Sequence, residues 1–218
     1  MSAPYRLVFF DVDSTLVTIE GIDVLGRGEA RIVELTEAAM NGAIPLEEVY
    51  ARRLELIRPT RADVDGLAAR YGQSLVDGAA GTIDALQRAG AIVHLVTAGI
   101  EQAILPLAET LGVRNVHAVR LRFADDGSYA DFDRRSPLTH AGGKETVVRD
   151  VRARTKGKAA FVGDGASDLE VKPAVDLFIG FGGVRERQLV KANADLYVQT
   201  MGEILSALTD QFRISNFE

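Results

Sequence analysis

Hydrophobic positions gather in short runs along the chain, each about as long as a buried strand. The runs cover residues 6–10, 91–96, 159–162, 175–179 and, more weakly, 196–198. Helical periodicity fills most of the stretches between them. Strands that alternate with helices are typical of a parallel sheet covered by helices on both faces. We therefore predict an α/β fold built on a Rossmann-like doubly wound parallel sheet.

The alternation of strands and helices stops between residues 17 and 77, where the periodicity is helical throughout. One helix is predicted to have Pro45 in its first turn and to continue through "LEEVYARRLELI". Another is predicted to begin at a capping box of Thr60 and Asp63 and to end at Gly72. These patterns predict an all-helical insertion directly after the first strand.

The domain organisation follows from this insertion. Residues 1–16 and 78–218 are expected to form the α/β core, and residues 17–77 a helical cap above the ends of its strands. Residues 119–132 contain two strand-like stretches around an Asp-Gly turn, which predicts a small β-hairpin. The chain has no internal repeat and no low-complexity tract.

Composition narrows the classes of function. The chain has 218 residues, of which 47% are hydrophobic, enough for a sizeable core. A formal net charge of -6 and a pI near 5.2 argue against nucleic acid or an anionic membrane as partner. The absence of cysteine excludes disulfides, thiolate metal sites and cysteine nucleophiles. No signal peptide or membrane span is recognised, and we predict a cytoplasmic protein.

Two carboxylates, Asp11 and Asp13, directly follow the first apolar run. Residues two apart in an extended chain point to the same side, so both carboxylates are expected to face the ligand crevice at the strand end. Ser14 and Thr15 add hydroxyl groups suited to phosphate oxygens. Taken alone, this pair leaves open a second reading, in which Asp13 and Ser14 only cap a turn.

A second acidic pair, Asp164 and Asp168, follows the run at residues 159–162 in "GDGASD". Here Ser167 or Asp168 also suits a simple helix cap. However, the carboxyl ends of parallel strands meet at one edge of a sheet, so the two acidic pairs are expected to meet there. Carboxylate oxygens with open positions for water and phosphate are the ligands that magnesium prefers. The two pairs together predict a Mg²⁺ site.

Thr97 and Lys144 are the candidate phosphate ligands. Residues 97–99, "TAG", are expected to end the run at 91–96 and to begin a helix, where a hydroxyl and free N–H groups suit an anion. Lys144 in "AGGKE" is predicted at a helix start, an unfavourable place for a cation unless an anion is near. An ordinary N-cap and a solvated surface lysine remain the alternatives.

Arg53 stands out within the insertion. It falls in the apolar stripe of its helix, whereas Arg52 does not. The stripe consists of Leu46, Val49, Tyr50, Leu54 and Ile57. An inward arginine suits a carboxylate, from the protein or from a ligand. Glu20, at the start of the insertion, is a candidate partner for Arg53 or for a ligand ammonium group; a snorkelling Arg53 is the alternative.

Other chemistries are excluded by their missing motifs. His94, His117 and His140 lack metal-ligand spacing, and His94 is predicted to be a packed strand residue. The chain contains no P-loop, no complete dinucleotide fingerprint and no nucleophile elbow.

Four separated segments carry a resemblance to a known family. They are "FDVDSTLVTIEGID", "RRLELIRP", "GDGASD" and "FIGFGG", with Thr97 and Lys144 in order between them. With these segments the chain resembles the haloacid dehalogenase superfamily of phosphatases over nearly its whole length. The resemblance implies a Mg²⁺-dependent phosphomonoester hydrolase that works through an aspartyl-phosphate. It also implies a small phosphate ester as substrate, with O-phospho-L-serine favoured, and a place at the last step of serine biosynthesis.

The resemblance assigns roles to the acidic residues. Asp11 would attack phosphorus, and Asp13 would protonate the leaving oxygen and then activate water. Mg²⁺ would be bound by the Asp11 carboxylate, the backbone carbonyl of Asp13 and Asp164. Asp168 would support this metal site from behind its ligands.

The resemblance also implies a substrate site that spans cap and core. Its residues would be Glu20, Met40, Arg53, Thr97, Ala98, Gly99, Lys144 and Ser167. Within this set, Glu20 would hold the substrate ammonium group and Arg53 its carboxylate. Thr97 and Lys144 would complete the neutralisation of the phosphate.

Two segments depart from the family pattern. Relatives commonly have Ser-Gly-Gly where this chain has Thr97-Ala98-Gly99, and often Asn where it has Val119. A phosphatase or phosphotransferase for another small phosphate ester therefore stays open as an alternative. A phosphoaspartate receiver is less favoured, because this chain is long, carries a cap and has its lysine before the second acidic pair. A homodimer also stays open.

Overall fold

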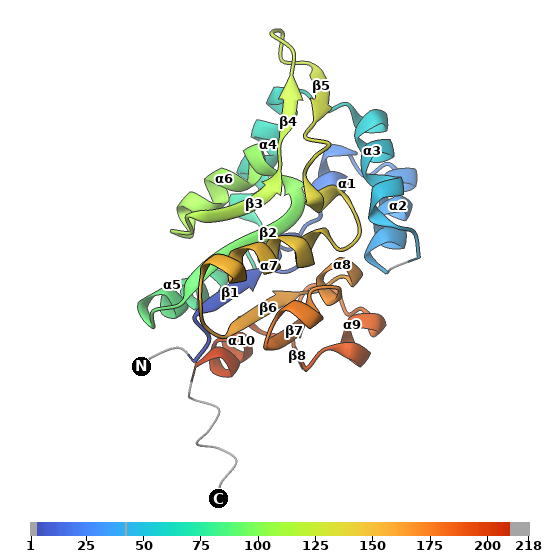
Figure 1. Ribbon diagram of the computed structural model, residues 1–218. Helices are drawn as coiled ribbons and strands as arrows, with labels where there is room; N and C mark the ends of the chain where they lie inside the picture. Colours follow the sequence, from blue (N-terminus) through green and yellow to red (C-terminus); the bar gives the residue numbers. More distant parts are fainter. Residues whose placement is uncertain (1–3, 42, 210–218) are drawn as a thin grey trace, which may run out of the picture.

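The computed structural model describes residues 4–41 and 43–209, and of Leu46 only the backbone (Figure 1). Within these residues the main sheet has six strands in the order β3-β2-β1-β6-β7-β8, and every neighbouring pair is parallel. A separate antiparallel hairpin, β4-β5, projects beyond it. The strands are β1 (Leu7–Phe10), β2 (Ile92–Ile100), β3 (Asn115–Val119), β4 (Leu121–Phe123), β5 (Tyr129–Phe132), β6 (Ala159–Gly163), β7 (Leu177–Phe181) and β8 (Leu196–Val198).

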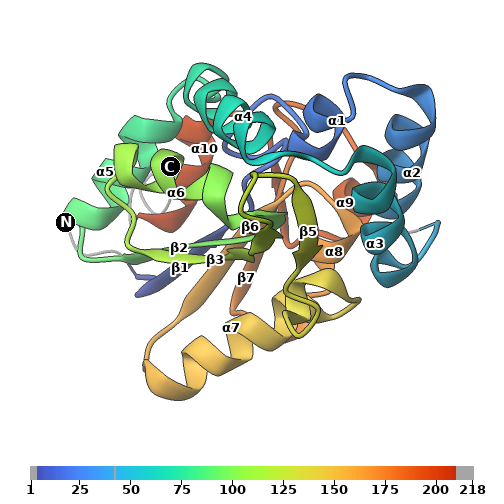
Figure 2. The ribbon, with the colours of Figure 1, turned by 90° about the horizontal axis from the view of Figure 1, so that it is seen from above.

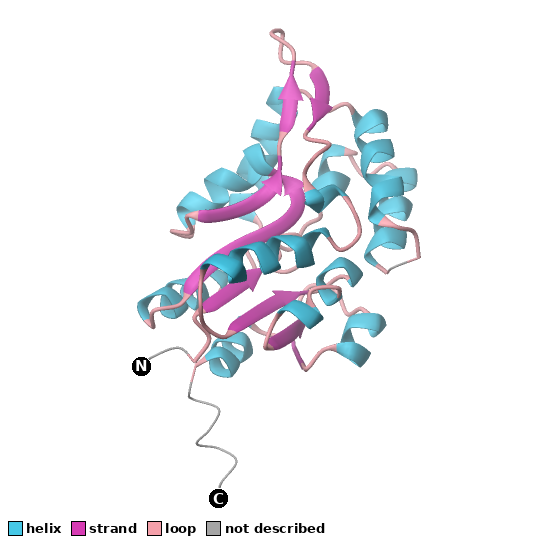
Figure 3. Ribbon diagram, in the orientation of Figure 1, coloured by secondary structure: helices cyan, strands magenta, loops and turns pink. Residues whose placement is uncertain are grey.

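Helices cover both faces of the sheet, as the alternating pattern predicts (Figure 3). Seen from above, α7 lies on one face, and α5, α6 and α10 lie on the other (Figure 2). The helices are α1 (Gly21–Leu25), α2 (Ala30–Met40), α3 (Leu46–Ile57), α4 (Arg61–Gln73), α5 (Ala79–Arg88), α6 (Glu101–Thr110), α7 (Gly143–Arg154), α8 (Ala166–Leu169), α9 (Gln188–Asn193) and α10 (Met201–Leu208), with 3-10 turns η1 (Pro137–Thr139) and η2 (Lys172–Ala174). None of the helices described is long and apolar enough to cross a bilayer.

Aromatic side chains form the centre of the core. Phe9, Phe161 and Phe178 come from the adjacent strands β1, β6 and β7, and none of them is exposed to solvent. Their rings stack across the strands, with centroids 6.4 Å and 6.2 Å apart. Burial of one such side chain stabilises the fold by about 2–3 kcal/mol. This packing fixes the register of the strands whose carboxyl ends build the site.

The helical insertion is confirmed. Helices α1 to α4 lie between β1 and β2 in the chain, and α1 to α3 sit beyond the carboxyl ends of the strands (Figure 1). Helix α4 packs along the core helix α6. A single β-bridge between Val17 and Leu75 closes the base of the insertion. The division into a cap of residues 17–77 and a core stays a prediction.

Several local predictions are confirmed. The capping box of Thr60 and Asp63 starts α4, with the Asp63 backbone N–H donating to Thr60 Oγ1 at 3.2 Å. The predicted hairpin at residues 119–132 is present as β4 and β5. His94 is buried in β2, where its ring packs 4.9 Å from Phe9.

Other local predictions were wrong. Residues 97–99 do not begin a helix: β2 continues to Ile100, which pairs with Val119 of β3, and α6 begins at Glu101. Strand β3 was not predicted, because most of its side chains are only half-buried and its apolar run is short. Helix α4 passes through Gly72 and ends at Gln73, and Pro45 is the N-cap of α3 rather than part of its first turn.

Candidate active site

A cavity lies where the strand ends meet the insertion. It encloses about 690 Å³, including its open mouth. The carboxylates of Asp11 and Asp13 line it, and so do all eight residues of the expected substrate site. Asp164 and Asp168 lie behind the lining, close to Asp11. The fold thus brings together residues that are more than 150 positions apart in the chain.

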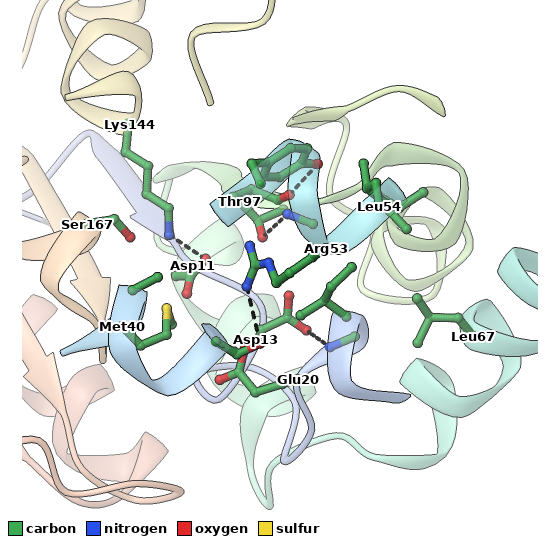
Figure 4. Close-up of a pocket in the computed structure, with 18 of the residues that line it drawn as sticks. Asp11, Asp13, Glu20, Met40, Arg53, Leu54, Leu67, Thr97, Lys144 and Ser167 are labelled. Atoms are coloured by element: carbon green, nitrogen blue, oxygen red, sulfur yellow. Dashed lines mark hydrogen bonds and ion pairs between the residues drawn. The ribbon is translucent and has the colours of Figure 1, made fainter. Parts of the chain in front are cut away.

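Four buried charges form one group at the carboxyl ends of β1 and β6, here called the strand-end cluster: Asp11, Lys144, Asp164 and Asp168. The Lys144 ammonium lies 2.7 Å from Asp11 Oδ1 and 2.6 Å from Asp168 Oδ1. Lys144 is the second residue of α7, as predicted from the sequence. The three carboxylates each have an oxygen within 4.8 Å of the others. Figure 4 shows Lys144 reaching toward Asp11 from one side of the cavity.

The turn after β6 orients Asp168. Its Oδ2 accepts the backbone N–H groups of Asp164 at 3.1 Å and Gly165 at 2.9 Å. A Cβ on Gly163 would clash with the Asp168 side chain, so glycine is required there for space. The turn therefore holds Asp168 with Oδ1 directed toward Lys144.

The electrostatics of the strand-end cluster favour an added cation. Burial, and then the neighbouring Asp168, raise the pKa of Asp11, although Lys144 acts in the opposite direction. Burial, Glu20 and Asp168 raise the pKa of Asp164. Three close carboxylates with hard oxygen donors fit a divalent ion such as Mg²⁺, because such an ion would relieve this repulsion. Asp11, Asp164 and Asp168 thus form a group that is consistent with a metal site.

Asp13 sits where the chain folds back on itself. The backbone of Ser14 is left-handed, with φ of 52°, and its N–H donates to the Ile19 carbonyl at 3.2 Å. Asp13 Oδ1 accepts the Gly21 N–H at 2.9 Å and the Tyr71 hydroxyl at 2.8 Å. Burial, Glu20 and Asp11 all raise the pKa of Asp13. Asp13 can therefore hold a proton beside the cavity at a pH where an exposed aspartate is ionised.

The insertion contributes a buried arginine to the opposite side of the cavity. Arg53 is only 6% exposed, and its Nη1 donates to Thr36 Oγ1 at 3.2 Å. Among the described residues its Nε has no hydrogen-bond partner. In Figure 4 the guanidinium group points into the centre of the cavity. The alternative of a snorkelling Arg53 is therefore wrong, because the guanidinium group is buried and can donate further hydrogen bonds.

Glu20 is also buried, and it does not pair directly with Arg53. Its Oε1 accepts the Ser14 hydroxyl at 2.6 Å, and Arg187 Nη2 lies 3.8 Å away. Burial raises the pKa of Glu20, while the Ser14 hydrogen bond lowers it. Glu20 thus presents a carboxylate to the cavity from the start of α1.

Arg187 was not predicted from the sequence as a residue of the site. It is buried between β7 and α9, and its Nε donates to Asp164 Oδ2 at 3.0 Å. Its Nη1 reaches Glu37 of α2 at 2.9 Å and Asn41 at 3.3 Å. Its position six residues beyond the end of β7 was the available signal, but the expected ligand residues lie directly after the strands, so this signal is weak. Arg187 joins the strand-end cluster to the insertion.

The residues that depart from the family pattern occupy different places. Thr97 and Ala98 line the cavity; Thr97 Oγ1 accepts the Gly99 N–H at 2.9 Å, and the Ala98 carbonyl accepts the Tyr50 hydroxyl at 3.0 Å. Val119 is buried at the end of β3, outside the cavity lining. Of the two departures, only the one at residues 97–98 therefore adjoins the site.

The comparisons agree with this geometry. Residues 8–171 match the family model of haloacid dehalogenase-like hydrolases, and the chain belongs to this family. It is similar to the phosphoserine phosphatase of Bos taurus, with 39% identity over 93% of each chain. It is 37% identical to the chloroplastic phosphoserine phosphatase of Arabidopsis thaliana, over 92% of this chain and 71% of the relative. A solved structure of a phosphoserine phosphatase, which represents an analogue of the phospho-aspartyl intermediate, superposes on this chain with a TM-score of 0.83. The two are 26% identical, and the match covers 94% of this chain and 99% of the other.

Proposed function

We propose that this protein hydrolyses O-phospho-L-serine to L-serine and inorganic phosphate, the last step of serine biosynthesis. One observation carries the proposal: a single cavity has a carboxylate–lysine cluster on one side and a buried, incompletely bonded arginine beside a glutamate on the other. The first side suits phosphoryl transfer to a carboxylate, and the second suits the two charged groups of an amino acid. The similarity to the phosphoserine phosphatases supports the same substrate.

The reaction uses the two aspartates in turn. An oxygen of Asp11 attacks phosphorus, the bond from phosphorus to the seryl oxygen breaks, and Asp13 gives its proton to that oxygen. Serine leaves, and Asp11 carries the phosphoryl group. Asp13 then takes a proton from water, whose oxygen attacks phosphorus and releases phosphate from Asp11. The raised pKa of Asp13 suits both proton transfers.

Charge neutralisation comes from several sides. Lys144 is already within 2.7 Å of Asp11 Oδ1, where it can also contact a phosphate oxygen, and Thr97 offers its hydroxyl from β2. Bound Mg²⁺ would be held by the Asp11 carboxylate, the Asp13 backbone carbonyl and Asp164, with Asp168 in support, and would neutralise charge on the transferred group.

The insertion supplies substrate selection. Arg53 binds the substrate carboxylate with its guanidinium group, whose Nε has no partner among the described residues, and Glu20 binds the ammonium group. Met40 covers the apolar part of the substrate, and Ala98, Gly99 and Ser167 border the phosphate. A substrate that lacks either charged group leaves one buried side chain without its partner, which opposes binding.

The test is phosphate release from a panel of esters in the presence of Mg²⁺. O-phospho-L-serine should have the highest kcat/KM. O-phosphoethanolamine, which lacks the carboxylate, and phosphoglycolate, which lacks the ammonium group, should each fall by roughly a hundredfold. Asp11→Asn should abolish turnover, and Asp125→Asn, at an exposed aspartate, should leave it unchanged. A sugar phosphate that is hydrolysed faster than phosphoserine would contradict the proposal.

Three further properties stay proposals. We place the protein in the cytoplasm, although one relative is chloroplastic, and fractionation of the cells that produce it is the test. A homodimer is tested by sedimentation. The division into core and a cap of residues 17–77 is tested by hydrogen exchange, in which the helices of the insertion should lose protection together.

A further inference from the structure

Asp13 is held by two donors on one of its oxygens. The Tyr71 hydroxyl donates to Oδ1 at 2.8 Å, and the Gly21 N–H donates to the same atom at 2.9 Å. Both donors belong to the helical insertion, whereas Asp13 directly follows the first core strand. Tyr71 is completely buried in α4. A core carboxylate is thus oriented entirely by groups from the insertion.

The place of the Tyr71 hydroxyl is built into the fold. A Cβ on residue 21 would clash with that hydroxyl, so only glycine leaves room for it. The backbone of Gly21 does not have a positive φ, which means that glycine is needed there for space and not for conformation. Helix α4 is capped at Thr60 and packs along α6, so the ring of Tyr71 is held on a rigid element.

The other oxygen of Asp13 is directed to the cavity. The hydrogen bonds of the described residues include none to Oδ2. Oδ2 lies 3.3 Å from the point where a Cβ on Gly99 would stand, and Gly99 lines the cavity. With Oδ1 occupied by two donors, Oδ2 is the oxygen available to the substrate.

We propose that Tyr71 is a positioning residue for the reaction: together with the Gly21 N–H it fixes Asp13 Oδ1, so that Oδ2 faces the leaving oxygen of the substrate. This inference rests on the proposed role of Asp13 as the proton donor. Tyr71 itself touches no reacting atom. Its effect should therefore be seen in the step that needs a proton and be absent where none is needed.

The experiment compares leaving groups. Values of kcat/KM, which report phosphoryl transfer to Asp11, are measured for O-phospho-L-serine, glycerol 2-phosphate and p-nitrophenyl phosphate. The first two release strongly basic alkoxides that need a proton, whereas p-nitrophenolate is stable without one. Tyr71→Phe keeps the ring and removes only the hydroxyl. It should lower kcat/KM roughly tenfold for both alkyl esters and less than about twofold for the aryl ester.

Two variants are the controls. Tyr50→Phe removes another buried hydroxyl of the insertion, one that donates to the Ala98 carbonyl and does not contact Asp13; it should affect the three esters alike. Asp13→Asn should show the same dependence on the leaving group as Tyr71→Phe, but larger. Should Tyr71→Phe fold poorly, Tyr71→Met fills much of the same space without a hydroxyl and replaces it.

The outcomes separate the two proposals. If Tyr71→Phe lowers all three rates equally while Asp13→Asn depends on the leaving group, Tyr71 is merely structural and the inference is overturned. If Asp13→Asn also shows no such dependence, the proposed role of Asp13 fails, and the inference fails with it. A selective loss for the alkyl esters in both variants supports positioning of Asp13 by Tyr71.

Discussion

The two sides of the cavity differ in how their charges are satisfied. In the strand-end cluster, Lys144 contacts two carboxylates and Asp168 accepts two backbone N–H groups as well. On the side of the insertion, Arg53 has a single hydroxyl partner at 3.2 Å, and its Nε has none among the described residues. Both sides are buried, so the contrast does not come from solvent.

We interpret this contrast as a division of the cavity into a side for the reaction and a side for substrate selection. Charges that neutralise one another form a preorganised site whose geometry does not depend on the substrate. Burial of a hydrogen-bond donor without a partner costs free energy, and such a donor is retained where a ligand supplies the missing acceptor. We propose that the unmet capacity of Arg53, which lines the cavity, marks the part of the cavity that distinguishes substrates. The following changes, in order of expected effect, test that division.

The largest effect is expected from Lys144→Met. The change leaves the carboxylates of Asp11 and Asp168 buried and facing each other. The free energy of unfolding should fall by about 3 kcal/mol, and phosphate release by about a thousandfold or more. Urea unfolding and a phosphate assay measure the two effects. Lys156→Met, at an exposed lysine, is the matched control and should change neither quantity. Phosphate release by Lys144→Met within tenfold of that of the unchanged protein would contradict the contrast.

Arg53→Met should have the opposite profile. We expect kcat/KM for phosphoserine to fall roughly a hundredfold, mainly through KM, because a charged hydrogen bond to the substrate is lost. Stability should stay the same or rise, because a buried and incompletely bonded cation is removed. For O-phosphoethanolamine the rate should hardly change. The neighbouring Arg52→Met, on the exposed side of α3, is the control, and an equal loss for both esters would contradict carboxylate binding by Arg53.

Arg187→Met tests the connection between the two sides. It removes the partner of Asp164 and a contact to Glu37, and should lower the free energy of unfolding by about 2 kcal/mol. If Asp164 binds the metal, added Mg²⁺ should restore part of this loss, as measured by urea unfolding with and without the ion. Arg185→Met is the control, because Arg185 also pairs with Glu37 but, among the described residues, forms no hydrogen bond or ion pair with Asp164. An equal response in both variants would argue against a special role for Arg187.

The smallest effect concerns acid sensitivity away from the cavity. His94 and His117 share a hydrogen bond of 3.2 Å between β2 and β3, and burial followed by His117 lowers the pKa of His94 to about 4. In the unfolded chain the pKa of His94 is near 6.5. The stabilisation of the fold by neutral His94 is therefore complete above that pH and is lost as the pH falls toward 4. We expect about 1–2 kcal/mol of lost stability over this range.

His94→Gln should reduce that pH dependence when urea unfolding is compared at pH 7 and pH 4.5. His140→Gln, at an exposed histidine, is the matched control. An unchanged slope in His94→Gln would show that the protonation of His94 does not cause the loss of stability in acid.

The sequence predicted the features that depend on local pattern. A fully buried strand at Leu7–Phe10 appears as an unbroken apolar run, and the carboxylates directly after it had to lie at the sheet edge. The Thr60 capping box is a contact over three residues. Periodicity along α3 was enough to place Arg53 on the apolar face, because helix geometry alone sets which positions share a face, but the burial of its head group was left open.

Features that depend on distant pairing were not predictable in this way. Strand β2 extends through Thr97 because Ile100 pairs with Val119, a contact that no local signal announces. The hydroxyl of Tyr71 reaches Asp13 only because Gly21 leaves space between them.

By itself, then, the sequence determined the order of strands and helices apart from β3 and residues 97–99, the acidic pairs at the strand ends and the place of Arg53 on the apolar face of its helix, because each depends on residues close together in the chain. Only the tertiary structure decided that Lys144 joins Asp11 to Asp168, that Arg187 joins Asp164 to the insertion, and that Arg53 Nε has no partner in the part of the chain described. The reason is physical. Hydrogen bonds between buried side chains depend on ångström distances, and these distances are set by the packing of the whole sheet with its insertion.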